Sequence, residues 1–258
     1  MTAATLLKRW DDAPEGFFAA EAAGLRWLSA AGGARCVGVN RVDRTAIELE
    51  RIAPVPPSRD AARAFGADLA RTHAAGADAF GVAPDGGTGP MFIGRRRMPV
   101  AHDQDWGAFY ARDRVLPFLE VAEEVGNIGP ADAAVVRDAC ALVASGDLDD
   151  DEPASRIHGD LWSGNVLWSA SGVVLIDPAA HGGHRETDLA MLALFGCAYL
   201  DDIYAGYEFV TRLRPGWRER TALHQLHPLA VHAAGHGAHY GDALVDAARE
   251  VLTMAEYS

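Results

Sequence analysis

The stretch RIHGDLWSGNVLW, residues 156–168, decides the fold, together with the segment DPAAHGGHRETDLAMLALFG at residues 177–196. The first stretch carries Asp160 and Asn165 with four residues between them. The second begins with Asp177, directly after a short apolar run. Three oxygen-bearing side chains at this spacing raise the question of whether the folded chain brings them to one place.

Two short apolar runs on either side of the tetrapeptide SASG predict a β-hairpin. We expect Trp168 to pair with Val173 across this turn. Because the sum of paired residue numbers is constant in an antiparallel hairpin, Asn165 then lies opposite Ile176. The hairpin thus returns Asp177 to the loop from which it started. The sequence therefore predicts one amide and one carboxylate side by side, with a second carboxylate one loop away.

This set of side chains suits phosphoryl transfer from ATP. Such a reaction needs one aspartate to accept or orient the proton of the acceptor hydroxyl, and an asparagine and a second aspartate to hold Mg²⁺. Asp160 and Asn165 have the spacing D-x-x-x-x-N of the kinase catalytic loop. A kinase-like fold also needs a strand lysine paired with a helix glutamate, and Lys8 and Glu21, 13 residues apart, fit that need. The sequence predicts a phosphotransferase.

The segments HGDLWSGNV, DPA and GHRETDLAMLALFG resemble the fructosamine kinase (ketosamine-3-kinase) family, a branch of the aminoglycoside-phosphotransferase and choline-kinase group. The similarity runs from about Lys8 to Tyr240 and takes in FFAAEAAGL, LERI, DWGAFYARDRV and LHQLHPLAVH. The His-Gly-Asp loop alone indicates only a small-molecule kinase. Trp162 and the His-Arg-Glu motif are what point to this branch.

The resemblance implies a role for each candidate residue. Asp160 would be the catalytic base, and Asn165 and Asp177 would be the metal ligands. Lys8 would hold the α- and β-phosphates of ATP. Glu21 would be the helix partner of that lysine, and the backbone near Glu50 and Ile52 would bind adenine. Trp162, His232 and Glu186 would contact the substrate, a ketosamine that receives the phosphate on its 3-hydroxyl. Asp188 would cap its helix and brace the catalytic loop.

The order of apolar patterns predicts two lobes. Residues 1–52 read as a strand, a helix and a hairpin, and the proline-rich segment after them reads as a linker. Residues 53–258 read as a helix capped by Ser58, a Gly- and Pro-rich loop at 80–99, two more helices, the SASG hairpin and a helical remainder. We expect an α+β, protein-kinase-like fold with a small, N-terminally shortened β-rich lobe and a larger helical lobe.

Composition limits the partners. The chain has 258 residues and a net charge of −13, so a nucleic-acid backbone would be repelled, whereas a cationic amine substrate would be attracted. Its three cysteines form no CxxC pair, which argues against a zinc site or a disulfide framework. The N-terminus carries charges where a signal peptide would be apolar, and no run is long enough to span a membrane. These features predict a cytoplasmic protein without a membrane partner.

Several of these residues also have purely structural interpretations. In these interpretations Asp177 only forms a turn at the end of a strand, Glu21 is a solvated residue on a helix, and Trp162 packs under its loop. His184, Arg185 and Glu186 form a salt-bridge cluster in the alternative interpretation. The histidines near the C-terminus include an i,i+4 pair, but no carboxylate or cysteine accompanies it, so a metal site there is not predicted.

One departure from the family pattern concerns ATP. Only seven residues precede Lys8 and none is glycine, whereas the family has a glycine-containing hairpin over the phosphates. A naturally shortened N-terminal lobe predicts weak ATP binding, and the alternative is that the hairpin is encoded upstream of Met1. The departure also keeps open a nucleotide-binding pseudokinase, beside a kinase of another amine such as an aminoglycoside or amino alcohol. A protein kinase is disfavoured, because the ten residues between Asp177 and Asp188 are too few for an activation segment.

Overall fold

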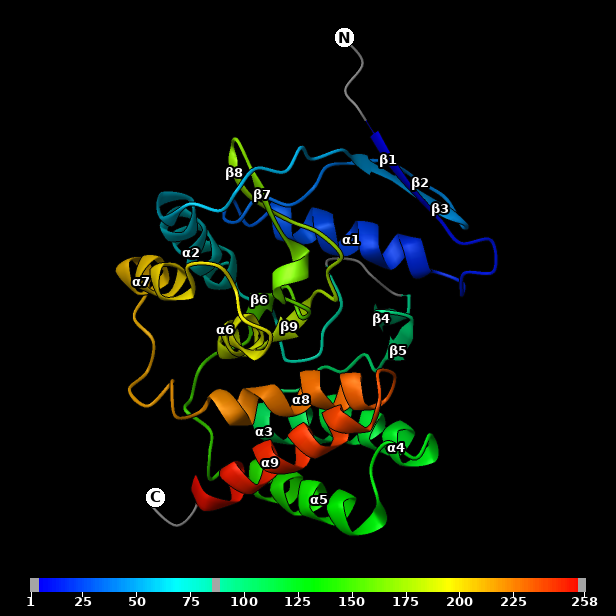
Figure 1. The fold of residues 1–258 in the computed structure, drawn as a ribbon, viewed down its shortest axis with the longest axis vertical. Helices are drawn as coiled ribbons and strands as arrows, with labels where there is room; N and C mark the ends of the chain where they lie inside the picture. Colours follow the sequence, from blue (N-terminus) through cyan, green and yellow to red (C-terminus); the bar gives the residue numbers. More distant parts are fainter. Residues whose placement is uncertain (1–4, 85–88, 255–258) are drawn as a thin grey trace.

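The computed structural model describes residues 5–84 and 89–254. Its N-terminal part is a three-stranded antiparallel sheet of order β1-β3-β2, built from β1 (Thr5–Arg9), β2 (Val39–Val42) and β3 (Ala46–Glu50). Helix α1 (Phe17–Ser29) runs along one face of this sheet (Figure 1). The strand, helix and hairpin predicted for this part of the chain are confirmed.

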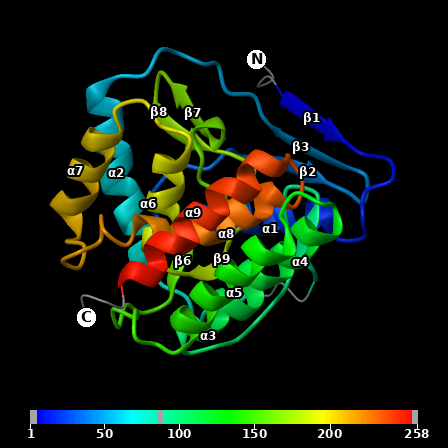
Figure 2. The ribbon, with the colours of Figure 1, turned by 60° about the horizontal axis from the view of Figure 1, so that its bottom comes forward.

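The larger part is helical. Ser58 caps the helix that follows the linker, since its hydroxyl accepts a hydrogen bond from the Ala61 N–H, as predicted. In Figure 2, α8 and α9 lie side by side over α5. The helices of this part are α2 (Arg59–Ala74), α3 (Trp106–Phe109), α4 (Leu116–Glu124), α5 (Pro130–Ala144), α6 (Arg185–Leu194), α7 (Leu200–Val210), α8 (Thr221–Ala233) and α9 (Ala238–Met254).

Helices α2 and α7 approach each other closely at two glycines. A Cβ atom on Gly66 would lie 1.9 Å from the carbonyl oxygen of Ile203, and one on Gly206 would lie 2.0 Å from that of Arg63. Side chains at these positions would therefore force the helices apart. Near the same contact, the buried Asp202 carboxylate pairs with Arg59 and Arg63 of α2.

The helix predicted from residue 105 onward is not continuous. Between α3 and α4, residues Tyr110–Val115 form a π-helical turn. This turn ends just before Pro117, which has no N–H to donate into the helix. The Tyr110 hydroxyl donates to the carbonyl oxygens of Leu223 and His224 of α8, at 3.1 and 2.9 Å. The irregular turn thus anchors this helix to α8.

Three pairs of short strands complete the part of the fold that the structure describes. The predicted SASG hairpin is confirmed as β7 (Val166–Ser169) and β8 (Gly172–Leu175). The loop expected at 80–99 instead contains a second hairpin, β4 (Met91–Ile93) and β5 (Arg96–Met98). A further pair, β6 (Ser155–Ile157) and β9 (His181–Gly183), was not predicted either. Strands of three residues are too short to show a period of two, so sequence pattern gives no signal for them.

The two parts of the chain share a hydrophobic core. Leu25 and Leu28 of α1 and Ile47 of β3 belong to the same buried cluster as Leu175 of β8 and Leu192 of α6. Backbone hydrogen bonds add to this contact: the Val37 N–H donates to the Leu175 carbonyl at 2.9 Å, and the Val55 N–H donates to that of Trp168 at the same distance. The SASG hairpin is therefore joined to the chain on both sides of the small sheet.

Candidate active site

The hairpin has the predicted register. Trp168 pairs with Val173, and the Ile176 N–H donates to the Asn165 carbonyl at 3.2 Å. The Asn165 side-chain nitrogen donates to the Asp160 backbone oxygen at 2.7 Å and to its carboxylate at 3.1 Å. Asn165 therefore orients the Asp160 carboxylate, while its own amide oxygen is not used in these contacts.

The backbone before Asp160 is held by a buried carboxylate from α6. Asp188 accepts hydrogen bonds from the N–H groups of His158 and Gly159, at 2.7 and 2.9 Å, and contacts His73 Nε2 at 3.1 Å. Burial opposes ionisation of Asp188, but these donors outweigh it and lower its pKa. The expected bracing is present. The expected cap is wrong, because His184 Nδ1 accepts from the Glu186 N–H at the start of α6.

His158 fixes the loop from the inside. Its Nε2 lies 2.9 Å from the Ile176 carbonyl, and its Nδ1 accepts from the Asp160 N–H at 3.2 Å. These partners require the tautomer with the proton on Nε2. Burial lowers the pKa of His158, which keeps the ring neutral. The histidine of the His-Gly-Asp motif thus ties the Asp160 backbone to the strand that leads to Asp177.

Lys8 reaches its expected partner Glu21 and also a second carboxylate, Asp177, for which no contact with Lys8 was predicted. Its Nζ lies 2.8 Å from Glu21 Oε1 and also contacts the Asp177 carboxylate. Burial opposes the charge of Lys8, but the carboxylates of Glu21 and Asp177 outweigh it and raise its pKa. Asp177 has a left-handed backbone with φ of 53°, a conformation that costs energy in a non-glycine residue and is concentrated at functional sites.

Asp160 has a strongly shifted acidity. Burial raises the pKa of this carboxyl to about 7, against the opposing hydrogen bond from Asn165, and the nearby charges of Asp177 and Asp188 add to the rise. A carboxylate with a pKa near neutrality is suited to accepting a proton from an alcohol and releasing it again. Asp160 therefore has both the position and the basicity of a general base.

These groups line one cavity of about 780 Å³. Its catalytic end carries Lys8, Glu21, Asp160, Asn165 and Asp177, and Trp162 lies on its wall. Other parts of its wall come from the N-terminal turn of α1 and the β4–β5 hairpin, with residues such as Trp10, Phe17, Phe92 and Arg95.

The predicted adenine residues do not line this cavity. The Glu50 side chain pairs with Arg35 and accepts from the Gly38 N–H at 3.4 Å, and Ile52 packs on the shared core. In the part of the chain that the structure describes, β1 is an edge strand that pairs only with β3. Adenine binding near Glu50 and Ile52, and weak ATP binding, stay predictions.

Trp162 is half-exposed, at 39% of its surface, and begins a row of aromatic rings. A Cβ atom on Gly164 would lie 2.2 Å from the indole, so the missing side chain makes room for it. Phe195 packs edge-on against Trp162, and His232 lies 4.9 Å from Phe195 between ring centres. His232 is thus one ring away from the cavity wall. No sequence signal distinguished Phe195 from other apolar residues of α6's end.

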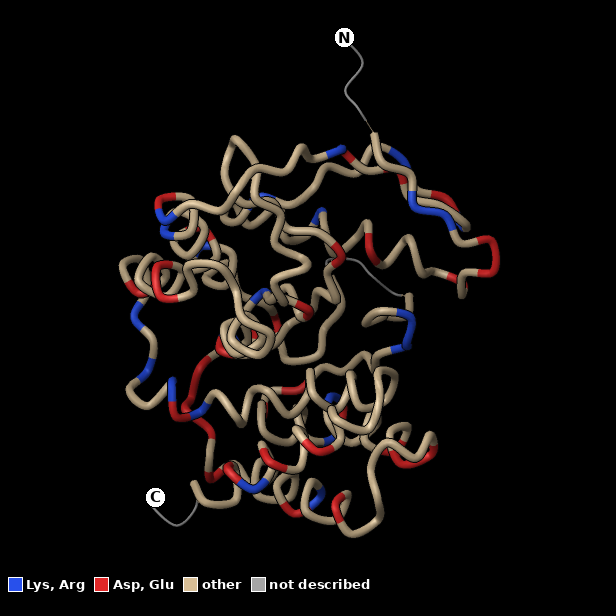
Figure 3. Tube along the Cα trace, in the orientation of Figure 1, with Lys and Arg blue, Asp and Glu red and all other residues tan. Residues whose placement is uncertain are grey.

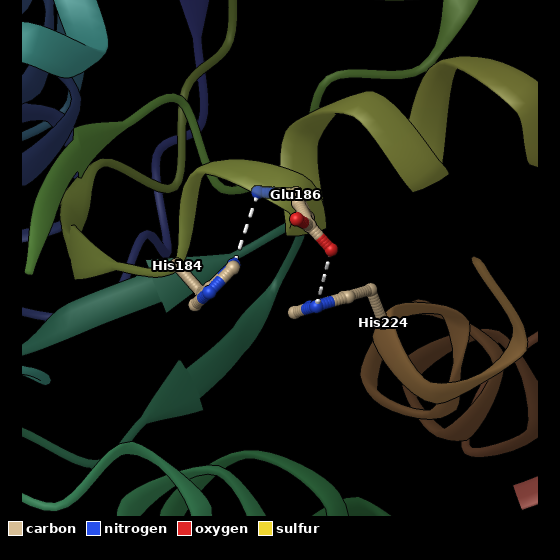
Figure 4. A group of neighbouring side chains, drawn as sticks. All are labelled: His184, Glu186 and His224. Atoms are coloured by element: carbon tan, nitrogen blue, oxygen red, sulfur yellow. Dashed lines mark hydrogen bonds and ion pairs between the residues drawn. The ribbon is translucent and has the colours of Figure 1, made fainter. Parts of the chain in front are cut away.

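Glu186, predicted to contact substrate, is not at the cavity. Figure 4 shows its carboxylate pointing toward His224 while its backbone N–H faces His184, and both carboxylate oxygens also accept from Arg220, at 2.9 and 2.6 Å. Only 2% of the residue is exposed. The alternative interpretation, a structural salt-bridge cluster, describes Glu186 better than a substrate contact does.

His184, Glu186 and His224 are residue types that bind metal ions, and their ligand atoms lie close together. These atoms, however, already have partners in the protein. His184 Nε2 contacts Asp150 at 3.0 Å, His224 Nδ1 contacts the Thr187 hydroxyl at 3.1 Å, and the Arg220 guanidinium occupies the Glu186 carboxylate. A divalent cation would have to displace that guanidinium. The group is built as an ion-pair network linking α6 and α8.

Comparison with known proteins decides the family. The model of the fructosamine kinase family matches residues 4–254. The chain belongs to the fructosamine kinase family. The expectation that it is a phosphotransferase is confirmed by this membership. Among curated relatives, a "Probable ketoamine kinase" of Enterococcus faecium is 30% identical over 92% of this chain and 84% of its own length. One of Vibrio vulnificus is 34% identical over 58% of this chain but only half of its own length.

Solved structures agree. A Thermobifida fusca protein assigned by name to fructosamine-3-kinase is 45% identical, with a TM-score of 0.90 over 97% of this chain and 86% of its own. A choline/ethanolamine kinase family protein of Mesorhizobium loti is 17% identical, with a TM-score of 0.61 over 98% of this chain and 84% of its own. The predicted α+β, protein-kinase-like fold is confirmed. Within the described residues, no helix of this family member is long and apolar enough to cross a membrane.

Proposed function

We propose that the protein is an ATP-dependent kinase that phosphorylates the 3-hydroxyl of ketosamines, sugars of fructose or ribulose type joined through C1 to an amine. The observation that carries the proposal is Asp160, a carboxyl with a pKa near 7, in one cavity with the Lys8, Glu21 and Asp177 ion pairs. Support for the substrate comes from the names of relatives, which include a mouse ketosamine-3-kinase 34% identical over 56% of this chain and 45% of its own length.

In this proposal each polar group has one task. The Asp160 carboxylate accepts the proton of the attacking hydroxyl. Lys8, held by Glu21, neutralises phosphate oxygens of ATP, so its contact to Asp177 is exchanged for one to the nucleotide. Asp177 and the unused amide oxygen of Asn165 are hard oxygen donors, and they fit Mg²⁺. Bound there, Mg²⁺ supplies the positive charge that offsets the negative charge on the transferring phosphoryl group.

The acceptor lies on the side of Trp162. A half-exposed indole offers a flat apolar face on which a sugar ring can stack, and His232 stands behind Phe195 where it can reach sugar hydroxyls after a small ring movement. Burial lowers the pKa of His232, and its Nδ1 lies 2.7 Å from the Pro228 carbonyl, which leaves Nε2 as a neutral acceptor. The protonated amine of a ketosamine suits a chain with a net charge of −13.

The same proposal places the enzyme in the cytoplasm, where ATP is available. Cys36, Cys140 and Cys197 are all free thiols, as expected for a reducing compartment.

The test is turnover of Mg·ATP with fructosyl-lysine or ribulosyl-lysine, with the new phosphate located by NMR. Phosphate at the 3-hydroxyl, absent from reactions with Asp160→Asn, supports the proposal. Phosphorylation of an aminoglycoside or choline without ketosamine activity would replace it by the amine-kinase alternative. Mg·ATP binding without turnover of any acceptor would favour a pseudokinase.

A further inference from the structure

The cavity wall carries a further cation, Arg95, to which the proposed phosphoryl-transfer chemistry assigns no role. Arg95 lies at the tip of the β4–β5 hairpin, where Ile93 pairs with Arg96 and closes a two-residue turn. The first turn residue, Gly94, has φ of 54°, as tight hairpin turns require. Arg95 is therefore presented at a fixed point of the cavity mouth and lines the cavity wall.

Arg95 has no carboxylate partner among residues 5–84 and 89–254. Of the three cationic residues on the cavity wall, Lys8 pairs with Glu21 and Asp177, and Arg9 pairs with Asp11. The Arg95 guanidinium instead lies over the Trp10 ring, 5.0 Å from its centre. The chain has 36 acidic and 23 basic residues, so an arginine that finds no acidic partner within the described ranges, beside a candidate active site, is suited to an external anion.

The neighbouring arginines differ in their surroundings. Arg96 donates to the carbonyl of Ala234 at the end of α8, which ties the hairpin to the helical lobe. The Arg97 guanidinium lies 5.6 Å from the Phe92 ring centre, and Arg97 does not line the cavity. Figure 3 shows the basic stretch that these residues form on the hairpin. Only Arg95 faces the cavity.

The hairpin lies apart from the segment where adenine is predicted to bind. In Figure 1 it lies below the N-terminal end of α1, whereas the segment between β3 and α2, where adenine is predicted, runs along the other side of the molecule. The cavity connects Arg95 with Asp160 and Trp162. Under the proposed function, an acceptor with its hydroxyl at Asp160 and its sugar on Trp162 lies in the same cavity as Arg95, where a group at its other end can meet this guanidinium.

We propose that Arg95 selects acceptors that carry an anionic group, so that the preferred ketosamines are free glycated amino acids with a carboxylate rather than neutral adducts. This inference rests on the proposed function and narrows its substrate class. A guanidinium that lies over an indole keeps the N–H groups at its own edge free. Two of these groups can donate parallel hydrogen bonds to a carboxylate. The same fork also fits a phosphate on the sugar.

The experiment compares two acceptors that differ only in charge: the fructosamine of 4-aminobutanoate and that of its primary amide. The three-carbon spacer keeps the basicity of the secondary amine alike in both. One charge-assisted contact at a partly open site corresponds to about a tenfold preference in kcat/KM for the carboxylate, expressed in KM rather than kcat. Arg95→Gln should reduce the preference to about twofold or less, and the matched control Arg97→Gln should leave it unchanged.

A third acceptor, the methylamine fructosamine with a 6-phosphate, tests the other source of the anion against its unphosphorylated form. A preference for the carboxylate over the amide, or for the 6-phosphate over the unphosphorylated sugar, that disappears in Arg95→Gln supports the inference and shows which anion Arg95 binds. Equal kcat/KM for charged and neutral acceptors in the wild type, or a preference that Arg95→Gln retains, overturns it and leaves the proposed function in place. Absence of phosphorylation of every ketosamine overturns the proposed function itself.

Discussion

Replacing Asp160 by asparagine should remove activity and stabilise the fold at the same time. Burial raises the pKa of this carboxyl to about 7, against about 3.9 in an unfolded chain. The folded state therefore keeps a proton that the unfolded state has lost, so the stability of the wild type falls as pH rises from about 4 to 7. At about 1.4 kcal/mol per pKa unit the full effect is about 4 kcal/mol. Because the carboxyl faces a water-accessible cavity, we expect about 1–3 kcal/mol. Asparagine has the same shape, has no charge to bury and keeps an oxygen that accepts from Asn165.

The measurement is urea unfolding of the wild type and Asp160→Asn between pH 4 and 8.5, without nucleotide. The variant should be more stable by about 1–3 kcal/mol at pH 8, with the difference vanishing near pH 4, while kcat falls by about 10²–10⁴. Asp202→Asn is the matched control, because that buried carboxylate pairs with Arg59 and Arg63 and its loss should destabilise. A variant of Asp160 that is no more stable than the wild type at pH 8 would refute the reasoning.

Three further substitutions test other parts of the structure. Asp188→Ala leaves two catalytic-loop N–H groups and His73 without their acceptor, and should lower the free energy of unfolding by about 3–5 kcal/mol in the same urea assay; a loss below 1 kcal/mol would contradict the bracing role. Gly66→Ala forces α2 and α7 apart and should cost about 1–3 kcal/mol in the same assay, and a variant as stable as the wild type would contradict this close approach of the two helices. Lys8→Met should raise the KM for ATP about tenfold or more in saturation kinetics at a fixed acceptor concentration, and an unchanged KM would remove Lys8 from the phosphate site.

The centre of the site was predictable because it depends on local pairing. The SASG turn fixes the register of its hairpin, and that register alone brings Asn165 beside Ile176 and hence beside Asp177. The contact of Lys8 with Glu21 follows in the same way from a strand and a helix that are neighbours in sequence. Such contacts are carried by short chain segments whose pattern is visible in the residues themselves.

Features that depend on distant segments were missed or misjudged. Glu186 stands in a motif that resembles substrate-binding residues, yet its partner Arg220 comes from the segment before α8, which no local pattern connects to it. Phe195 looks like any apolar residue until α8 places His232 against it. The β4–β5 hairpin lies in a Gly- and Pro-rich stretch that reads as a loop, so the position of Arg95 at the cavity could not be inferred.

The backbone bonds between the small sheet and the SASG hairpin restrict how this enzyme can open. Turning the sheet away as a rigid body would break the hydrogen bonds from Val37 to Leu175 and from Val55 to Trp168, and would expose the leucines that α1 shares with the helical lobe. The β4–β5 hairpin is fastened as well, by the hydrogen bond from Arg96 to the Ala234 carbonyl and by the contact of Arg95 with the Trp10 ring, so both walls of the cavity are held in place. We therefore expect no large rotation of the small sheet on nucleotide binding, so that the radius of gyration in solution should be the same with and without bound nucleotide.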